Sequence, residues 1–397
     1  MIHFQTAIVY FGLLFIMVGL GKLSCKISKK RINGEIKNVV NKKNWKYCLL
    51  AVFIFSVVMG LRYGVGVDFF TYGYAYDLFL KYGLGGYTEY STFEPGFSLL
   101  MMVLAVMKMP APVFYGVVAF LQLFFLSLIL KKQKFLIPYL FFAFISTGLI
   151  LDYANIMRQA LAISIGLYSI TFIVQKKPII HYALLSFAVL MHYSTILLFV
   201  LYPIFSRKQN WFSNRSIQIA LIGVSLLLMR FSLIQEVLAR IDVLATMLGY
   251  GGYLNDERME IDTKLGLGFL LTLVHFLIII WFSEDAKKFF RNKYFEIVYS
   301  IFIVGLFLNY CFINSMLLQR IVILFYYSYV VVDAFMLFYF FKKHRLIFYS
   351  LSMIMILLML SPIMGGVESP HSFVFVWQDG WCKMKEMYLY PSKLLTN

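Results

Sequence analysis

The sequence predicts an all-α, polytopic integral membrane protein with about 11–13 membrane-embedded helices. The first observation is composition: of 397 residues, 61% are hydrophobic and 14% are charged, whereas a soluble domain carries about 25% charged residues. The second is that apolar runs of around 20 residues, each long enough to cross a bilayer as a helix, recur from end to end. These runs are continuous rather than alternating, which favours helices over a β-barrel.

The apolar runs define candidate spans separated by short polar loops. These spans are 3–21, 46–61, 112–130, 135–151, 156–174, 216–234, 265–282, 295–313, 320–341 and 346–361. Residues 95–108 are apolar but short, and we interpret them as a helix half-inserted from the outer side that ends at Pro110. Residues 178–205 lie between two basic loops, which we expect on the same side of the membrane, so this segment should cross the membrane an even number of times. About 28 residues at 1.5 Å each make two helices of about 20 Å, so we predict a short hairpin with its tip near His192.

The net charge of +17 indicates membrane topology rather than binding to nucleic acid. Its basic residues gather in short loops, as cytoplasmic loops do. The segment 22–46 holds nine basic residues and one acidic residue, so we place it in the cytoplasm. The loops 62–94 and 235–264 are net acidic and fall on the opposite side. We expect residues 1–362 to form one transmembrane domain and residues 363–397 an extracytoplasmic tail.

Most polar side chains that could carry chemistry lie at the outer ends of apolar runs. They are Arg62, Asp68, Tyr72, Glu94, Arg158, Gln159, His192 and Arg320. Each type also has a purely structural interpretation: arginines snorkel to lipid headgroups, a histidine is satisfied within a hairpin core, and tyrosines form an interfacial belt. Arginines on the outer side run against the positive-inside bias, which favours a functional role for Arg158 and Arg320. Arg230, His275 and Asp333 lie inside apolar spans without an obvious partner and rank lower.

This set of side chains suggests the handling of an anion at the outer membrane face. Two or three guanidiniums can bind a pyrophosphate bidentately, where lysine would act only as a point charge. His192, or alternatively Asp68 or Glu94, could take a proton from a sugar hydroxyl. The sequence has no glycine-rich phosphate loop, and its four cysteines are dispersed without metal-ligand spacing. We therefore expect neither a nucleotide nor a metal cofactor.

Several short motifs resemble the EpsG family. The run from Leu61 to Tyr72 is similar to the family's R-x-x-x-G-x-D-x-x-x-Y start. The others follow in order: Glu94-Pro95-Gly96-Phe97, Ile156-Met157-Arg158-Gln159-Ala160-Leu161-Ala162, Met191-His192-Tyr193-Ser194 and Gln319-Arg320. The family is similar to Wzy-type polysaccharide polymerases and O-antigen ligases. The resemblance covers about residues 60–330 and implies a GT-C-like helical bundle.

The resemblance further implies a glycosyltransferase of the bacterial cytoplasmic membrane that polymerises exopolysaccharide, capsular or O-antigen repeat units. Its substrates would be undecaprenyl-diphosphate-linked glycans, and a chain-length regulator and a flippase of the same pathway would be its partners. In that reading His192, Asp68 and Glu94 are the catalytic candidates. The substrate-binding candidates are Arg62, Arg158, Gln159, Arg320 and Tyr72. A lipid-linked glycan flippase and a membrane acyltransferase acting on glycans are the alternatives. A flippase should show pseudo-symmetric halves, and the sequence shows no internal repeat.

Overall fold

The computed structural model describes residues 2–25, 27–32, 35–40, 44–83, 93–230, 266–363 and 371–381. These residues are mostly helical, with four short strands, which confirms the predicted class of polytopic helical membrane protein. Six described helices are long and apolar enough to span a bilayer, or up to eight if each bent pair is one span. Shorter apolar helices of 10–17 residues account for the difference from the predicted number of about 11–13. The GT-C-like arrangement stays a prediction.

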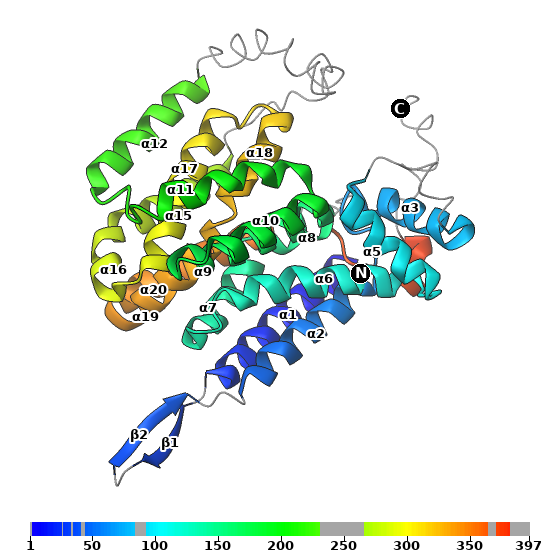
Figure 1. Cartoon of the computed structure of the whole chain (residues 1–397), viewed down its shortest axis with the longest axis horizontal. Coiled ribbons are helices and arrows are strands. Elements are labelled where there is room, and N and C mark those ends of the chain that lie inside the picture. The colour runs from blue at the N-terminus through cyan, green and yellow to red at the C-terminus, as the bar shows by residue number, and fades with distance from the viewer. Residues whose placement is uncertain are drawn as a thin grey trace. The chain divides into compact units, whose positions relative to one another are not determined.

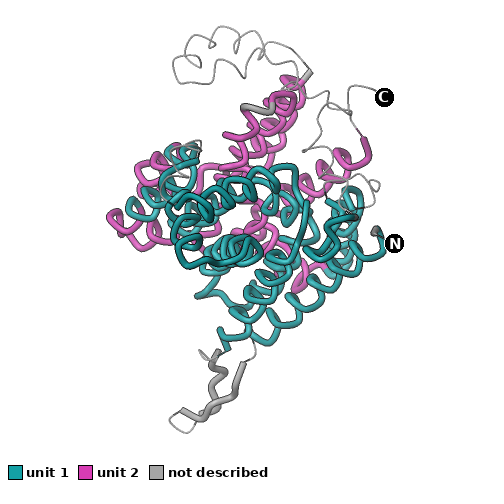
Figure 2. Tube along the Cα trace, turned by 90° about the vertical axis from the view of Figure 1, so that its right-hand side faces the viewer, with its two compact units in different colours: residues 1–169, 182–196, 345–397 teal, residues 170–181, 197–344 magenta. Residues whose placement is uncertain are grey.

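The chain divides into two compact units, which Figure 2 colours separately. Unit 1 comprises residues 1–169, 182–196 and 345–397, and unit 2 comprises residues 170–181 and 197–344. Unit 1 holds α1 (Ile2–Ser24), α2 (Trp45–Gly60), α3 (Phe69–Tyr82), α5 (Pro95–Val106), α6 (Ala111–Leu128), η2 (Lys134–Leu136), α7 (Ile137–Ser146), α8 (Leu149–Asn155), α20 (Arg345–Ile363) and η5 (Val376–Trp381), with most of α9 (Met157–Val174) and α10 (Pro178–Met191). Its strands are β1 (Ile27–Ile32), β2 (Glu35–Val40), β3 (Arg62–Tyr63) and β4 (Val374–Phe375). Unit 2 holds α11 (Leu201–Phe205), α12 (Arg215–Arg230), α15 (Leu267–Trp281), α16 (Ser283–Phe290), α17 (Lys293–Cys311), α18 (Met316–Tyr326) and α19 (Tyr329–Lys343), and η3 (Tyr193–Val200) bridges the two.

One end of unit 1 carries the basic segments. The antiparallel pair β1–β2 lies between α1 and α2 along the chain and projects from their shared end (Figure 1). At the same end the Lys131 ammonium lies 5.9 Å from the ring of Trp45, and the Cys25 thiol donates to the carbonyl of Lys134. The segment 22–46, which the sequence assigns to the cytoplasm, and the basic loop Lys131–Lys134 are therefore neighbours.

The opposite end of unit 1 is tied together by β3 and β4. Arg62 pairs with Phe375 in this antiparallel ladder, and the amide of Val376 donates to the carbonyl of Leu61. The first turns of α1 hold the same segment, because Thr6 Oγ1 accepts from the amide of Phe373 at 2.9 Å. Part of the expected tail, residues 371–380, thus packs against this end rather than extending away from it.

Several predicted elements differ in detail. The predicted straight span 135–151 is broken, because α7 and α8 meet at 69° around Gly148, whose φ is +82°. The segment 62–94, predicted to be an outer loop, contains a helix, α3, that the sequence analysis missed because polar residues interrupt its apolar residues. Residues 178–205 are not one helix: α10 ends at Met191, and a separate 3₁₀ segment begins at Tyr193. The loop 235–264 lies outside the described residues.

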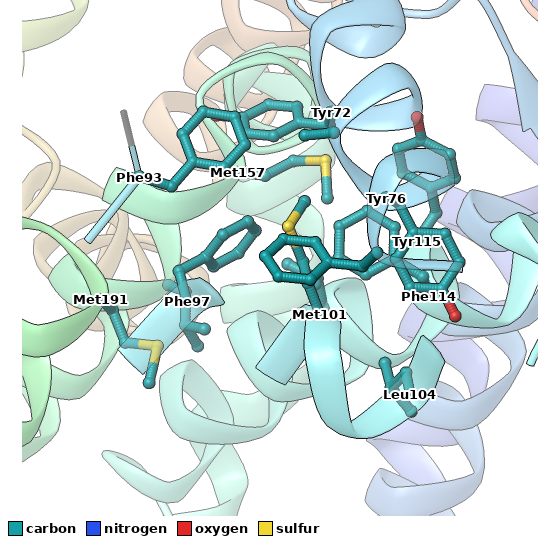
Figure 3. Packing of buried hydrophobic residues seen from close by; sticks show 14 of the residues in the cluster. Tyr72, Tyr76, Phe93, Phe97, Met101, Leu104, Phe114, Tyr115, Met157 and Met191 are labelled. Atoms are coloured by element: carbon teal, nitrogen blue, oxygen red, sulfur yellow. The ribbon is translucent and has the colours of Figure 1, made fainter. Parts of the chain in front are cut away.

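An aromatic and methionine cluster fixes α3, α5, α6, α9 and α10 against one another (Figure 3). Tyr76 stacks on Phe114 with ring centroids 4.7 Å apart, which joins α3 to α6. Phe97 and Met101 of α5 and Met157 of α9 fill the centre of the cluster and are at most 1% exposed. Rings of this size bury large areas and adopt defined relative orientations, so the ends of these helices are held in register.

Unit 2 contains a tight helix pair. A Cβ placed on Gly305 of α17 would lie 2.5 Å from the backbone nitrogen of Tyr326, so only glycine lets α18 approach this closely. The predicted span 320–341 begins earlier than expected, since α18 starts at Met316 with the Ser315 side chain accepting from the amide of Leu318. That N-terminal cap fixes where the helix carrying Gln319 and Arg320 starts.

We predict that Gly96→Ala destabilises the protein. A Cβ at this position would lie 2.8 Å from the Cβ of Leu190 and 2.9 Å from its carbonyl oxygen, both rigid parts of α10. Overpacking of this kind costs about 1–3 kcal/mol of unfolding free energy. The measurement is the thermal unfolding midpoint in detergent micelles. Gly19→Ala on α1 is the control, because nothing lies within 4 Å of its Cβ and alanine is the better helix former. Equal midpoints for the two variants would contradict the close contact.

Candidate functional site

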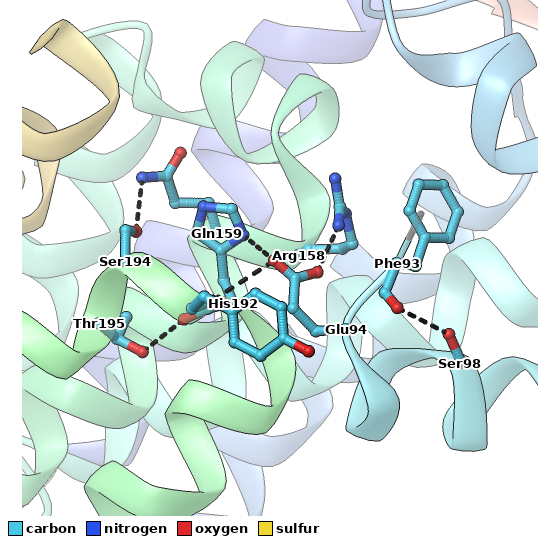
Figure 4. A network of polar contacts seen from close by, with 9 residues as sticks. Phe93, Glu94, Ser98, Arg158, Gln159, His192, Ser194 and Thr195 are labelled. Carbon is cyan, nitrogen blue, oxygen red and sulfur yellow. Dashed lines mark hydrogen bonds and ion pairs between the residues drawn. The ribbon is translucent and has the colours of Figure 1, made fainter. Parts of the chain in front are cut away.

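Three motif residues meet in loops at the β3–β4 end of unit 1, where α5, α9 and α10 begin or end. Glu94 precedes α5, and Pro95 occupies the first helical position, which suits its fixed φ. Arg158 is the second residue of α9, directly after the break that separates α8 from α9. His192 follows the last residue of α10. Residues nearly 100 positions apart in sequence are thus brought into contact (Figure 4).

The Glu94 carboxylate binds both partners at once. Its Oε1 atom lies 2.6 Å from Nδ1 of His192, and its Oε2 atom accepts from Nη1 of Arg158. The amide of Tyr193 also points to Oε1, at 3.4 Å. The side chain of Glu94 is 5% exposed, and those of Arg158 and His192 are each 21% exposed. We call these three residues the Glu94 cluster; its carboxylate is enclosed, and its two partners reach the surface.

The charges in the Glu94 cluster set its protonation. Burial favours the neutral acid, but the hydrogen bond from His192 and the positive charge of Arg158 outweigh it and lower the pKa of Glu94 below its ordinary value. An ionised Glu94 only accepts hydrogen bonds, so Nδ1 of His192 carries the proton. In the neutral imidazole Nε2 is then the acceptor and can take a proton.

Arg158 is held over aromatic rings as well as by Glu94. Its guanidinium carbon lies 4.3 Å from the ring centre of Phe93 and 6.0 Å from that of Tyr72. Tyr72 is 3% exposed, so its ring is held within the hydrophobic cluster near the guanidinium. A planar guanidinium stacks on such faces and keeps its in-plane N–H groups for other acceptors. The Arg158 side chain can therefore contact Glu94 and an incoming anion together.

Gln159 stabilises the turn that carries His192. Its Nε2 atom donates to Oγ of Ser194 at 3.3 Å, and the side chain is 4% exposed. Thr195 adds a second local bond, donating from Oγ1 to the carbonyl of His192 at 2.7 Å. The buried Gln159 side chain therefore orients the segment that follows His192.

Arg62 is enclosed by backbone carbonyls. Its side chain is 1% exposed and donates to the carbonyls of Met59 and Ala154, with a further contact of 3.1 Å to the sulfur of Met157. Burial lowers its pKa to about 10, which still leaves it charged at neutral pH. The guanidinium also lies 4.9 Å from the ring centre of Tyr115. Arg62 thereby joins the end of α2 to the junction of α8 and α9.

The remaining predicted site residues lie elsewhere. Asp68 occupies the turn before α3, and its amide donates to Oδ1 of Asn155 at 3.0 Å. Gly66 makes that turn possible. Its φ is +94°, and a Cβ at this position would lie only 3.0 Å from the Cα of Asn155. Arg320 lies on α18, which belongs to unit 2.

The expectation that His275 and Asp333 lack a partner is wrong. His275 Nε2 lies 2.9 Å from Oδ1 of Asp333, and the two side chains are 1% and 0% exposed. They come from α15 and α19 of unit 2, 58 positions apart. The one signal available from sequence was that each sits alone in an apolar run, where such residues pair with each other. Arg230 ends α12, and its side chain is outside the described part. Among the described residues, no three His, Cys, Asp or Glu side chains are grouped as metal ligands.

We predict that Arg62→Lys destabilises the protein more than Arg158→Lys does. Lysine cannot reach the carbonyls of Met59 and Ala154 together, and a buried carbonyl without its donor costs about 1–3 kcal/mol. Arg158 is partly exposed, so its lysine variant keeps water as a substitute partner. The thermal unfolding midpoint in micelles measures both, with the exposed Arg207→Lys as control. A larger loss for Arg158→Lys would contradict the structural role of Arg62.

Comparison with known proteins gives a family. The sequence model described as the EpsG family matches residues 45–369, which includes the Glu94 cluster, Arg62, Asp68 and Arg320. Searches of curated proteins and of solved structures each found no match. The match extends over most of the chain and includes each motif that resembled the family in sequence. The chain therefore belongs to the EpsG family, whose members are multi-pass membrane proteins associated with exopolysaccharide biosynthesis.

Proposed function

We propose that this protein is a glycan polymerase of the cytoplasmic membrane. It transfers an undecaprenyl-diphosphate-linked glycan chain onto a lipid-linked acceptor at the outer face. The observation that carries the proposal is the Glu94 cluster, which holds a histidine and an arginine on one buried carboxylate. The cluster combines a base with an anion-binding group. The basic segments mark the end of unit 1 near Trp45 and Lys131 as the cytoplasmic end in this proposal. The opposite end, which holds Arg62 and β4, would then face outward.

The reaction joins a sugar hydroxyl to an anomeric carbon. Nε2 of His192 takes the proton from the acceptor hydroxyl while its oxygen attacks the anomeric carbon of the donor glycan. The bond between that carbon and the diphosphate oxygen breaks, and undecaprenyl diphosphate leaves with the electron pair. Glu94 stabilises the imidazolium that forms, because its carboxylate already faces Nδ1. The proposed transfer therefore needs neither a nucleotide nor an oxidant.

Arg158 stabilises the leaving group. Negative charge grows on the diphosphate as the bond breaks, and a fixed guanidinium facing that charge lowers the barrier. Arg158 is oriented by Glu94 and by the ring of Phe93 before substrate binds, so little reorganisation is needed. Arg320 remains a predicted diphosphate-binding residue on the ground of the sequence alone. Glu94, ionised and shared between the Arg158 guanidinium and the His192 imidazole, is better suited to orient His192 than to act as the base.

Gln159, Tyr72 and Arg62 have supporting roles in this proposal. Gln159 and Tyr72 hold His192 and Arg158 in place through Ser194 and through ring contact. Arg62 keeps the junction before α9 in position through its bonds to Ala154 and Met157. Asp68 remains the alternative base, from the turn before α3.

We predict that His192→Ala and Arg158→Lys each abolish most chain extension. Loss of a general base slows transfer by about 10²–10⁴-fold, and loss of about 3 kcal/mol of leaving-group stabilisation slows it about a hundredfold. Arg320→Lys should behave as Arg158→Lys does. The measurement is polymer length made from lipid-linked substrate in membranes, normalised to protein level, with Arg207→Lys as control.

The outcomes separate the roles. Near-normal polymer from both lysine variants would refute the binding of diphosphate by these arginines. Normal polymer from His192→Ala alone would assign the base to Asp68. A deletion strain should accumulate single lipid-linked repeat units, whereas loss of outward-facing units would indicate a flippase.

We predict that the β4 end of unit 1 faces outward. Because the basic segments define the cytoplasmic end, a cysteine in place of the exposed Trp377 should react with an impermeant maleimide in intact cells, in a variant without the native cysteines. A cysteine in place of the exposed Lys131 should react only after the cells are opened. The reverse result would place the Glu94 cluster on the cytoplasmic side and exclude this reaction.

A further inference from the structure

We propose that an aromatic cleft in unit 1, beside the Glu94 cluster, binds sugar rings of the glycan chain. This inference rests on the proposed function and adds a subsite to it. The cleft has a volume of about 630 Å³, within the range of about 300–1,000 Å³ that is usual for ligand pockets. Its walls come from β3, α3, the start of α6 and the C-terminal segment. Its lining residues are Arg62, Tyr63, Phe69, Phe70, Thr71, Gly73, Tyr74, Asp77, Ala111, Pro112, Tyr115, Val376 and Asp379.

Helix α3 has two aromatic faces with different destinations. Tyr72 and Tyr76 are at most 3% exposed and pack into the hydrophobic cluster. Phe70, Tyr74 and Asp77, spaced i, i+4 and i+7, share the other face and line the cleft. Tyr74 is 59% exposed there, so the core does not account for it. An aromatic ring displayed on a concave surface is the usual platform for the apolar face of a pyranose ring.

The polar groups of the cleft favour a sugar over an anion or a lipid tail. The carboxylates of Asp77 and Asp379 are both exposed at its edge and would repel a phosphate, yet they accept hydrogen bonds from hydroxyls. The guanidinium of Arg62 is engaged by the carbonyls of Met59 and Ala154. A polyhydroxylated ring matches this mixture of aromatic faces and carboxylate acceptors, whereas an acyl chain would leave the carboxylates facing hydrocarbon.

The cleft and the Glu94 cluster share structural elements. Arg62 lines the cleft and contacts the sulfur of Met157, the residue before Arg158. Tyr72, which lies 6.0 Å from the Arg158 guanidinium, belongs to α3, whose opposite face carries Tyr74. A glycan whose diphosphate is bound at Arg158 would therefore lie next to α3, and its sugars would reach the cleft by passing around this helix.

The C-terminal segment completes this subsite. Val376 and Asp379 form one wall, and Gln378 fixes them through two hydrogen bonds with Gln5 of α1, at 2.7 and 3.0 Å. A sequence region outside every family motif thus contributes to the proposed subsite. Specificity for particular sugars would reside in this wall and in α3.

The test is binding of oligosaccharide by the full-length chain in detergent micelles. The probe is the set of oligosaccharides released by partial acid hydrolysis from the polymer that the source strain secretes, which carry no diphosphate. Titration calorimetry should show binding to the wild type, weakened about tenfold or more by Tyr74→Ala and changed less than about threefold by Tyr74→Phe, which keeps the ring. Tyr82→Ala is the matched control, because Tyr82 is 48% exposed on the same helix and does not line the cleft. Asp77→Asn should also weaken binding, since it removes a carboxylate acceptor.

Wild-type affinity in Tyr74→Ala, or no binding by the wild type, would overturn the cleft as a sugar subsite. The failure of the proposed function looks different. If His192→Ala and Arg158→Lys both polymerise normally while Tyr74→Ala loses oligosaccharide binding, the cleft stands and the proposed site of transfer falls. His192→Ala itself should bind the oligosaccharides with wild-type affinity, because His192 lies outside the cleft.

Discussion

The arrangement of the β3–β4 end of unit 1 depends on one buried carboxylate with two partners, a guanidinium and an imidazole. Glu94 joins the loop before α5 to the start of α9 and the end of α10 through Arg158 and His192. Removing a carboxylate from water costs several kcal/mol, and the cost is offset only when its oxygens are fully paired. Both oxygens of Glu94 are paired here, and so the three loops are fixed relative to one another. Loss of either partner would leave one oxygen of the buried Glu94 carboxylate unpaired, and the three loops would no longer be fixed.

The carboxylate reaches its partners because the helices below it are closely packed. Gly96, two residues after Glu94, lets α5 lie against Leu190 and Met191 at the end of α10. Arg62 satisfies the carbonyls near the α8–α9 junction, so that Arg158 enters at a fixed position. The ladder between β3 and β4 in turn holds Arg62 at its backbone. The four family motifs that lie in unit 1, although short and separate in sequence, are therefore packed against one another.

Sequence analysis could predict the membrane class because apolar length and basic loops are read directly from composition. It also identified Glu94, Arg158 and His192 as candidates, since polar residues stand out at the ends of apolar runs. It could not assign the pairing among them, because nothing in sequence spacing determines which carboxylate meets which base. The same limit hid the bond between His275 and Asp333. The helix α3 was missed since a tyrosine-rich amphipathic helix lacks a long apolar run, and the role of residues 371–380 was missed because β4 is two residues long.

The shared carboxylate has a consequence for the proposed reaction. Arg158 is bound by Glu94 before substrate arrives, and a diphosphate competes for the same guanidinium. When the diphosphate binds Arg158, the contact between Arg158 and Glu94 weakens. The carboxylate then interacts more strongly with the proton on Nδ1 of His192, which makes Nε2 a better base. Binding of the donor would thus activate the residue that deprotonates the acceptor. An arginine and a histidine on separate carboxylates would bind and deprotonate independently, and a hydroxyl could then be activated without a donor in place. A single carboxylate between them makes the two events depend on each other, which suits the proposed transfer between two large lipid-linked substrates.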